Sequence, residues 1–386
     1  MTSPFVLQKN GHFDLSHGFL PNKDPITHLP AELKAWDDFA YQLPKYLTSN
    51  HFRDFVKALP EFNINALKTG EDFERAMMIL SFITHAYVWL GGAKPAEILP
   101  AVVAKPLCAI AKKLGRPPVQ SYASYALYNW RRFDPKKPIE LGNIALLQNY
   151  LGGIDEEWFI LIHIDIEQKA TRGMAALLPA EKAVRENKPS DLLHALNEME
   201  ISLALMQKTM ERMPENCDPY IYYNRVRPYI HGWKDNPALP QGLIYEGEFD
   251  NKPAQFKGET GAQSGIIPLF DAALKVEHAN TPLKQHLDQM RKYMPPEHQA
   301  FLDELEGAPS IRTYIQQQNN DDLKKVYNRC IELIAEFRTT HLKYAAQYIE
   351  KQNQTSEANS TAVGTGGTPF MAYLKKHRDE TQAFLL

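Results

Sequence analysis

The chain has 386 residues, with 43 basic and 46 acidic side chains and a formal net charge of −3. This balance excludes a protein that binds nucleic acid chiefly through a basic surface. Three cysteines are too few for a disulfide framework or a thiolate metal cage, and none of the thirteen histidines belongs to a zinc motif. The 44% hydrophobic content is typical of a globular protein of one large or two ordinary domains.

The N-terminal residues lack the basic and apolar regions of a secretory signal. The most apolar stretch, residues 98–111, is interrupted by Pro100, Lys105 and Pro106, which excludes a membrane span. We therefore expect a cytoplasmic protein that has neither nucleic acid nor membrane as a partner.

The first part of the chain is punctuated by prolines, and apolar residues at three- and four-residue spacing predict helices over 70–89 and 95–114. The polar, proline-containing stretch 131–138 is typical of a boundary. We predict a smaller, mostly helical N-terminal domain at 1–133 and a larger helical domain at 134–386. The fold class is mainly α.

One segment has a mixed pattern. The isoleucines at 160, 162, 164 and 166 alternate with other residues, as in a strand. The surrounding stretch 155–178 contains no glycine before Gly173, and its length favours a helix. We predict a helix.

The larger domain contains long helical patterns. Helices are predicted over 190–212, with Ser190 as its cap, after Asp218-Pro219, in the region 287–312, and over 321–349. The last would span about 45 Å. Residues 242–265 are predicted to be a loop, and the polar stretch 352–368 a mobile loop.

His341 interrupts the apolar stripe of the last long helix. It is either a core histidine with a hydrogen-bond partner or an axial ligand of a haem iron, which binds neutral imidazole. Arg338, three residues earlier, is either solvated or in an ion pair. His163 is either a hydrogen-bonded histidine, which its spacing alone favours, or a polar group in a binding pocket.

Arg227 lies beside tyrosines and precedes Pro228, which predicts a kinked helix. Tyr222, Val226, Arg227 and Ile230 share one side of it. The arginine is either a surface residue packed on the tyrosines or a carboxylate-binding group. The glycine-threonine stretch 364–368 lacks the lysine of a phosphate-binding P-loop and is a weak motif.

An ordered series of strings resembles the indoleamine 2,3-dioxygenase family over nearly the whole chain. The strings include Gly18-Phe19-Leu20-Pro21-Asn22, Ala86-Tyr87-Val88-Trp89, Gly232-Trp233-Lys234, Gly242-Leu243-Ile244-Tyr245-Glu246-Gly247, Met290-Arg291-Lys292-Tyr293-Met294-Pro295-Pro296 and Gly364-Thr365-Gly366-Gly367-Thr368. The sequence is similar to a distant, bacterial-type member, related to the tryptophan 2,3-dioxygenases.

The resemblance implies a haem b enzyme that uses O2 to cleave the C2–C3 bond of L-tryptophan or a related indole, giving an N-formylkynurenine-type product. It also implies a monomer and an electron donor that keeps the iron ferrous. His341 matches the proximal iron ligand, and Arg338 the arginine that pairs with an aspartate, here Asp271. The positions that match substrate-binding residues are Tyr122, Tyr125, Tyr222, Arg227, Thr260 and Thr365.

Three positions depart from the family pattern. His163 replaces a serine in many members, and could contact the indole N–H as a catalytic or orienting group. Tyr222 replaces a usual phenylalanine. Glu259 replaces a small residue, where its carboxylate would clash with substrate, bind its ammonium group or point to solvent. These departures leave open a haem-dependent indole-binding or sensor protein with little turnover. A helical interaction protein without a cofactor is the third reading.

Overall fold

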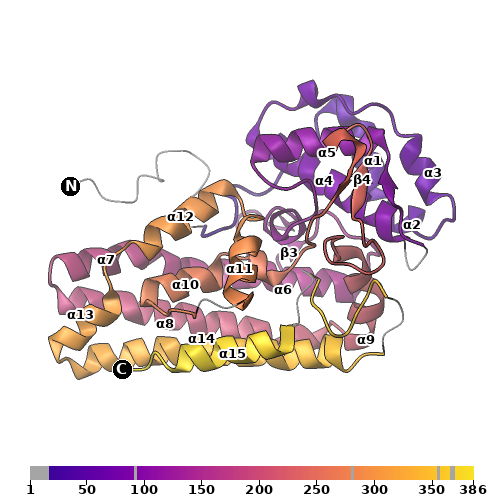
Figure 1. The fold of residues 1–386 in the computed structure, drawn as a ribbon. Coiled ribbons are helices and arrows are strands. Elements are labelled where there is room, and N and C mark those ends of the chain that lie inside the picture. The colour runs from indigo at the N-terminus through magenta and orange to yellow at the C-terminus, as the bar shows by residue number, and fades with distance from the viewer. Residues whose placement is uncertain (1–16, 91–93, 280–281, 354–356, 366–369) are drawn as a thin grey trace.

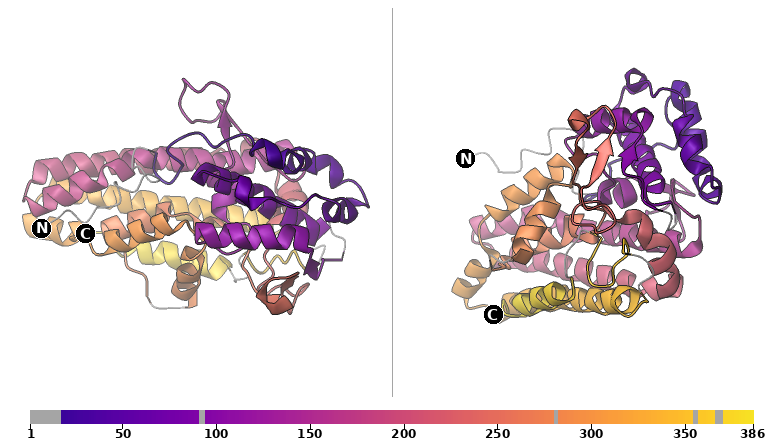
Figure 2. Two further views of the ribbon diagram at one scale, coloured as in Figure 1. Left: turned by 90° about the horizontal axis from the view of Figure 1, so that it is seen from above. Right: turned by 45° about the vertical axis from the view of Figure 1, so that its right-hand side comes forward.

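The computed structural model describes residues 17–90, 94–279, 282–353, 357–365 and 370–386. The mainly helical fold class is confirmed. The longest helices run roughly along one another through the larger part of the molecule, whereas the N-terminal helices gather at one end (Figures 1 and 2). A division at residue 133 stays a prediction.

The N-terminal group contains five α-helices. The predicted helix over 70–89 is confirmed as α4, whose first turn is closed by reciprocal hydrogen bonds between Thr69 and Asp72. The predicted helix over 95–114 starts later, at Ala101, because residues 98–99 pair as a strand. The five helices are α1 (Lys34–Tyr41), α2 (Leu43–Tyr46), α3 (Phe52–Lys57), α4 (Gly70–Trp89) and α5 (Ala101–Leu114).

Short strands connect the N-terminal group to the rest of the molecule. β1 (Ile98–Leu99) pairs in parallel with β4 (Leu243–Tyr245), which pairs antiparallel with β5 (Pro253–Ala254). β2 (Arg131–Arg132) pairs antiparallel with β3 (Ile144–Ala145). The prediction of a loop over 242–265 is therefore wrong in part, since two strands lie within it.

The segment with alternating isoleucines is a helix, as predicted, and forms α6 (Ile154–Ala175). Ile160, Ile162 and Ile164 are all fully buried, although successive isoleucines project from different sides of the helix. The helix is therefore surrounded by protein on several sides. This explains why apolar residues do not follow a single helical stripe.

The helices α7 (Leu177–Arg185) and α8 (Pro189–Glu211) pack against α6, α14 (Asp321–Ala345) packs against α8, and α15 (Phe370–Gln382) packs against α14. The predicted Ser190 cap is wrong: Pro189 is the first helical residue and no side chain caps α8. The predicted helix over 321–349 is α-helical only to Ala345, and Ala346–Glu350 continues it as a π-helix.

Shorter helices lie around the long ones: α10 (Ile266–Leu274), α11 (Pro282–Arg291) and α12 (Pro296–Glu306) along them, and α9 (Pro219–Ile221) and α13 (Ile311–Gln318) toward opposite ends (Figure 1). The region predicted to be helical, 287–312, falls within three separate helices that are divided by turns. Among the described helices, none has the length and apolar character that crossing a membrane requires.

Candidate functional site

The three tyrosines that were predicted to line a pocket lie at or within two π-helical segments. Tyr122 directly precedes the π-helix Ala123–Leu127, which contains Tyr125, and Tyr222 begins the π-helix Tyr222–Val226. A π-helix adds a residue to the turn and shifts the side chains that follow, and such segments are frequent at functional sites. All three tyrosines are buried.

The aromatic side chains meet around Phe159, which the sequence reasoning missed. Its ring centroid lies 4.7 Å from those of His163 and Tyr222, and 6.5 Å from that of Tyr125. The Tyr122 ring lies 5.9 Å from the His163 ring. The structure thus brings together the four predicted pocket residues. Phe159 could have been found, because it lies one helical turn before His163 on α6.

His163 has a defined hydrogen-bonding state. Its Nδ1 lies 2.7 Å from the carbonyl oxygen of Phe159. Because a carbonyl oxygen only accepts, Nδ1 carries the proton. Burial lowers the pKa of His163 and so favours the neutral ring. Nε2 then offers a lone pair to the pocket.

Glu167 extends the same face of α6 by one more turn. Its side chain is fully buried, and one carboxylate oxygen accepts a hydrogen bond of 2.8 Å from the Ser264 hydroxyl, whereas the other has no hydrogen-bond partner among the described residues. Burial raises the pKa of Glu167 to about 7. Phe159, His163 and Glu167 therefore form a row of one aromatic and two titratable groups.

His341 is accessible to solvent, yet protein surrounds it. Burial, and to a smaller extent the charge of His163, lowers its pKa to about 4. The ring is accessible to solvent, so His341 is not part of the packed core. The prediction that the imidazole lies within a packed apolar surface is wrong. Neither ring nitrogen hydrogen-bonds to a described residue, so a neutral imidazole is available to a ligand.

A close contact between two backbone segments fixes the position of Glu259. A Cβ atom at Gly258 would lie 2.2 Å from the Gly232 amide nitrogen, so only glycine fits there. The Glu259 amide then donates a 3.0 Å hydrogen bond to the Ile230 carbonyl oxygen. Gln263 fixes the same loop, because its side chain bonds both the Gly258 carbonyl and the Tyr122 amide, each at 2.9 Å.

The Glu259 side chain is buried, with 4% of the residue exposed, so its carboxyl does not point to bulk solvent as one expectation allowed. Burial raises its pKa to about 8. Thr365 donates a hydrogen bond to the Glu259 carbonyl oxygen, and the Thr260 hydroxyl accepts one of 3.4 Å from the Ala262 amide. Thr365 and Glu259 therefore meet although 106 residues separate them.

Arg227 is fully buried, which rules out the surface reading. The helix that carries it changes from α9 through the π-helix to a 3-10 helix at Arg227–Ile230, where Pro228 lacks an amide hydrogen. Burial lowers the pKa of Arg227 to about 10. Its guanidinium donates to the Asn359 side chain and, at 2.9 and 2.6 Å, to the carbonyl oxygens of Ser360 and Val363.

Asn359 anchors the described part of the predicted mobile loop, residues 357–365, above Arg227. Its side-chain amide donates to the Tyr223 carbonyl at 2.7 Å, and its own carbonyl accepts from the Tyr223 hydroxyl. His231 donates to the Asn359 side-chain oxygen at 3.1 Å. Residues 366–368 of the glycine-threonine motif lie outside the described residues.

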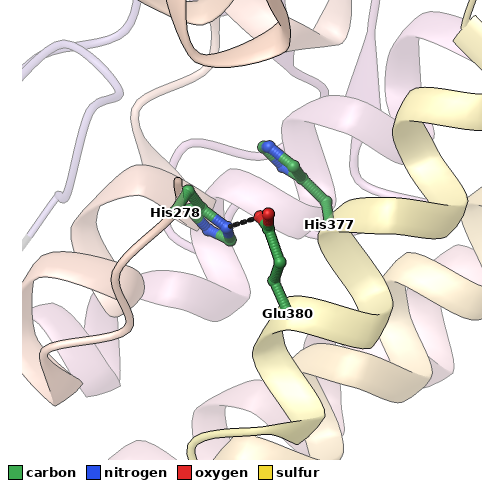
Figure 3. Close-up of side chains that lie close together, drawn as sticks. All are labelled: His278, His377 and Glu380. Carbon is green, nitrogen blue, oxygen red and sulfur yellow. Dashed lines mark hydrogen bonds and ion pairs between the residues drawn. The ribbon is translucent and has the colours of Figure 1, made fainter. Parts of the chain in front are cut away.

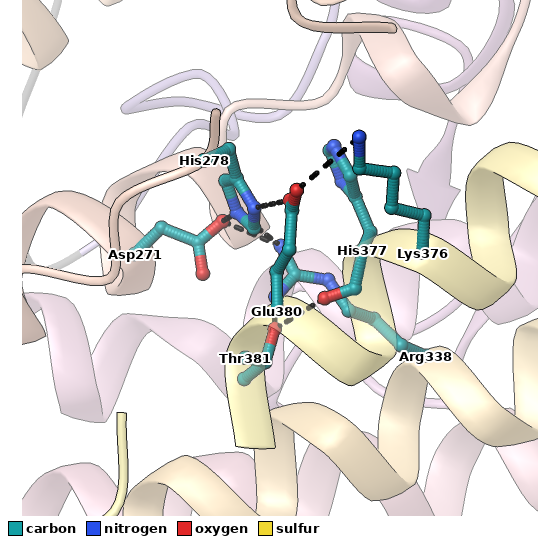
Figure 4. Close-up of polar contacts among 7 residues, drawn as sticks. All are labelled: Asp271, His278, Arg338, Lys376, His377, Glu380 and Thr381. Atoms are coloured by element: carbon teal, nitrogen blue, oxygen red, sulfur yellow. Dashed lines mark hydrogen bonds and ion pairs between the residues drawn. The ribbon is translucent and has the colours of Figure 1, made fainter. Parts of the chain in front are cut away.

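Arg338 and Asp271 form the predicted ion pair, 2.5 Å apart and largely buried. Burial alone would raise the pKa of Asp271, but the Arg338 charge and a hydrogen bond from His278 outweigh it and lower that pKa. Arg338 also donates to Thr381 on α15 (Figure 4). The pair therefore joins α10, α14 and α15 three residues before His341.

These features fit a haem. An accessible neutral imidazole is a ligand that haem iron takes from a protein, and a hydrogen-bonded ion pair holds the helix that carries it. On the other side, aromatic rings, a neutral histidine and a guanidinium suit a flat aromatic molecule that has a carboxylate.

Comparison with known proteins supports this reading. The indoleamine 2,3-dioxygenase family model matches residues 9–384. Indoleamine 2,3-dioxygenase 2 of Mus musculus is 34% identical over 388 residues, which cover 97% of this chain and 94% of the relative. Indoleamine 2,3-dioxygenase of Saccharomyces cerevisiae is 31% identical over 95% of this chain and 91% of its own length.

A third relative has a substrate in its name: 6-hydroxytryptophan 2,3-dioxygenase of Fusarium equiseti is 28% identical over 96% of this chain and 95% of its own length. These three relatives are animal and fungal proteins, and the bacterial type stays a prediction. Because the family model and the relatives span almost the whole sequence, this chain belongs to the indoleamine 2,3-dioxygenase family of haem-dependent dioxygenases, which are oxidoreductases.

Proposed function

We propose that this protein binds haem b through His341 and uses O2 to open the indole ring of L-tryptophan or a closely related indole. The product is of the N-formylkynurenine type. The observation that carries the proposal is that the accessible His341 ring lies near His163, which itself contacts the Tyr122 and Phe159 rings. An external electron donor has to keep the iron ferrous.

The bound haem supplies the oxidising chemistry with O2. The protein contributes the ligand and its orientation. His341 offers a neutral nitrogen, and the Arg338–Asp271 ion pair fixes the part of α14 that presents it. Because both partners of the pair are largely buried, the helix is held without direct contact to substrate.

The pocket aromatics position the indole. Phe159, Tyr125 and Tyr222 offer ring faces and edges that suit stacking against a flat substrate. His163 accepts the indole N–H at Nε2, because its Nδ1 proton is committed to the Phe159 carbonyl. Holding the reacting carbons in one orientation is a large part of catalysis for two bound reactants.

Arg227 binds the substrate carboxylate by exchanging partners. Without substrate, the guanidinium is satisfied by Asn359 and by two backbone carbonyl groups of the loop. A carboxylate is a stronger acceptor than a neutral carbonyl oxygen and takes a guanidinium in a bidentate manner. Substrate entry therefore displaces the Ser360 and Val363 carbonyls, and the loop settles again over the bound molecule through Thr365.

Glu259 receives the substrate ammonium group. Its pKa of about 8 means that the carboxyl group is mostly protonated at neutral pH when the pocket holds no cation. A neighbouring ammonium favours the charged carboxylate and lowers that pKa. Binding of an amino acid is thus expected to release a proton from Glu259, whereas binding of an indole without an amino group is not.

The test is turnover by haem-loaded, reduced protein in air. L-tryptophan is expected to give N-formylkynurenine, tryptamine to bind weakly because it lacks the carboxylate, and indole-3-propionate to bind without proton release. Product analysis by mass spectrometry and calorimetry in two buffers of different ionisation enthalpy measure these outcomes. Absence of product from tryptophan and from hydroxylated tryptophans overturns the proposal.

A further inference from the structure

Beside the Arg338–Asp271 ion pair lie three side chains that the proposed reaction does not use. They are His278, in the segment after α10, and His377 and Glu380, one turn apart on α15 (Figure 3). One ring nitrogen of each histidine and a carboxylate oxygen of Glu380 lie within 4.8 Å of one another. In the part of the chain that the structure describes, this is the group of histidine, cysteine and acidic side chains that is close enough to share an ion.

We propose that His278, His377 and Glu380 bind a divalent transition-metal ion, with Zn²⁺ as the best match. Two imidazoles and one carboxylate form the three-ligand set of zinc sites that keep a fourth position for water. The absence of a thiolate argues against Cu(I), and two nitrogen ligands argue against Mg²⁺ and Ca²⁺, which prefer oxygen. The site uses neither His341 nor a residue proposed to bind substrate, but His278 contacts Asp271 of the ion pair that holds α14.

The first support is an unsatisfied ring nitrogen. His377 is buried, with 8% of the residue exposed, and its Nε2 has no hydrogen-bond partner among the described residues. A buried polar atom without a partner costs about 1–3 kcal/mol, so it commonly marks the place of a bound ion or water.

The second support is the hydrogen bonding of His278. Its Nδ1 lies 2.8 Å from a Glu380 carboxylate oxygen, and its Nε2 lies 3.3 Å from the Asp271 carboxylate. A metal-binding histidine usually donates its other ring N–H to a carboxylate, which orients the ring. Asp271 already lies at Nε2, where the Arg338 guanidinium is also 3.4 Å away, so the ring is held from that side while Nδ1 faces Glu380 (Figure 4).

Two features oppose metal binding, and both have to change before the three side chains can bind an ion. The His278 and His377 rings are stacked, with centroids 4.1 Å apart and planes at 8°, so their lone pairs do not yet converge. The Lys376 ammonium lies 3.8 Å from Glu380 and competes for the carboxylate. The Lys376 side chain is 46% exposed and can turn into solvent. Coordination therefore requires a ring rotation and the departure of Lys376, with the α15 backbone unchanged.

The experiment measures Zn²⁺ binding to the full-length, haem-loaded protein after treatment with a chelator. Isothermal titration with zinc chloride gives stoichiometry and affinity, and X-ray absorption at the zinc edge identifies the ligand atoms. We expect one Zn²⁺ per chain, with two histidine nitrogens and at least one oxygen in the absorption spectrum. A site that contains sulfur, or oxygen alone, overturns the proposal, as does the absence of stoichiometric binding.

Three variants sharpen the test. His377→Phe keeps an aromatic ring against His278 but removes a ligand, and Glu380→Gln keeps the hydrogen-bonding shape; each should weaken zinc binding at least about tenfold. Lys376→Gln removes the competing charge and should strengthen it severalfold. His194→Gln, at an exposed histidine of α8, is the matched control and should change nothing. Equal affinity in the wild type, His377→Phe and Glu380→Gln contradicts the proposal, and the Soret band checks folding in each sample.

Discussion

The two sides of the proposed haem site differ in how their polar groups are satisfied. The proximal network, formed by Asp271, His278, Arg338 and Glu380, is charged, and each member has an ionic or hydrogen-bonded partner. On the pocket side, His163, Glu167 and Glu259 are held toward their neutral forms by burial. In the first arrangement the Asp271, Arg338 and Glu380 side chains already have partners of their own.

The second arrangement leaves binding capacity for a ligand. A neutral, buried titratable group can change its state or its partner when a charged molecule arrives, at less cost than a group that must first leave an ion pair. Arg227 follows the same logic, because its partners are carbonyl and amide oxygens rather than a carboxylate. The difference separates the residues that hold the site from those that respond to substrate.

The largest expected effect follows from replacing His341. His341→Ala should lose the haem, and therefore the Soret band and all turnover, because the described structure offers the iron no second imidazole on α14. His163→Ala is the matched variant on the pocket side and should retain the haem. Both are read from absorption spectra after haem supplementation, and a normal haem content in His341→Ala contradicts the ligand assignment.

Breaking the proximal network should destabilise the protein strongly. Asp271→Ala leaves the Arg338 guanidinium buried without its charge partner, and the expected loss in the free energy of unfolding is about 3–5 kcal/mol. Denaturant unfolding measures it. Glu259→Gln removes a buried carboxyl on the pocket side and should lower the free energy of unfolding much less at pH 6. Similar losses for both variants would contradict the view that the two sides differ in how their polar groups are satisfied.

Replacing Arg227 should act on substrate rather than on haem. Arg227→Ala removes a charged hydrogen-bonding group worth about 1.5–3 kcal/mol, so kcat/KM for L-tryptophan should fall by about 10- to 100-fold. The loss should be far smaller for tryptamine, which has no carboxylate to bind. Steady-state kinetics with both substrates decide this, and equal losses would assign Arg227 a purely structural role.

Glu259 should make stability depend on pH. Because its pKa rises from 4.5 to about 8 on folding, the folded protein keeps a proton that the unfolded chain has released, and stability falls as pH rises between these values. The slope from this group is at most about 1.4 kcal/mol per pH unit. Glu259→Gln should flatten the dependence of unfolding on pH, and an unchanged slope would mean that the carboxyl is not protonated in the fold.

The smallest effect is expected at His163. Loss of one neutral hydrogen bond to the indole costs about 1 kcal/mol, so His163→Ala should lower kcat/KM for L-tryptophan about fivefold. With 1-methyltryptophan, which has no indole N–H, the variant and the wild type should differ little. A larger loss with the methylated substrate would show that His163 acts by another route.

Several elements were predictable because their determinants are local. The helix start at Asp218-Pro219, the position of His341 on the last long helix and the helical state of the isoleucine segment follow from neighbouring residues and from length. The Arg338–Asp271 pair came from the resemblance rather than from a pattern, since 67 residues separate its partners.

The remaining features depend on contacts between distant segments. The burial of Arg227 requires Asn359, 132 residues away, and the burial of Glu259 requires the backbone contact between Gly232 and Gly258. Neither contact has a sequence pattern of its own. The π-helices also escaped prediction, because one inserted residue per turn leaves no periodic signal over five residues.

The parallel pairing of β1 with β4 has a consequence for any attempt to divide this protein. A fragment that ends at the predicted boundary would contain Ile98–Leu99 without Leu243–Tyr245, and would expose an unpaired strand edge of the kind that promotes aggregation. It would also lose the carbonyl oxygens of Tyr229 and His231, which pair with His85 and Trp89 of α4 at 2.7 and 2.8 Å. Truncation would therefore leave two buried ring nitrogens without partners, and the intact chain is the unit to express.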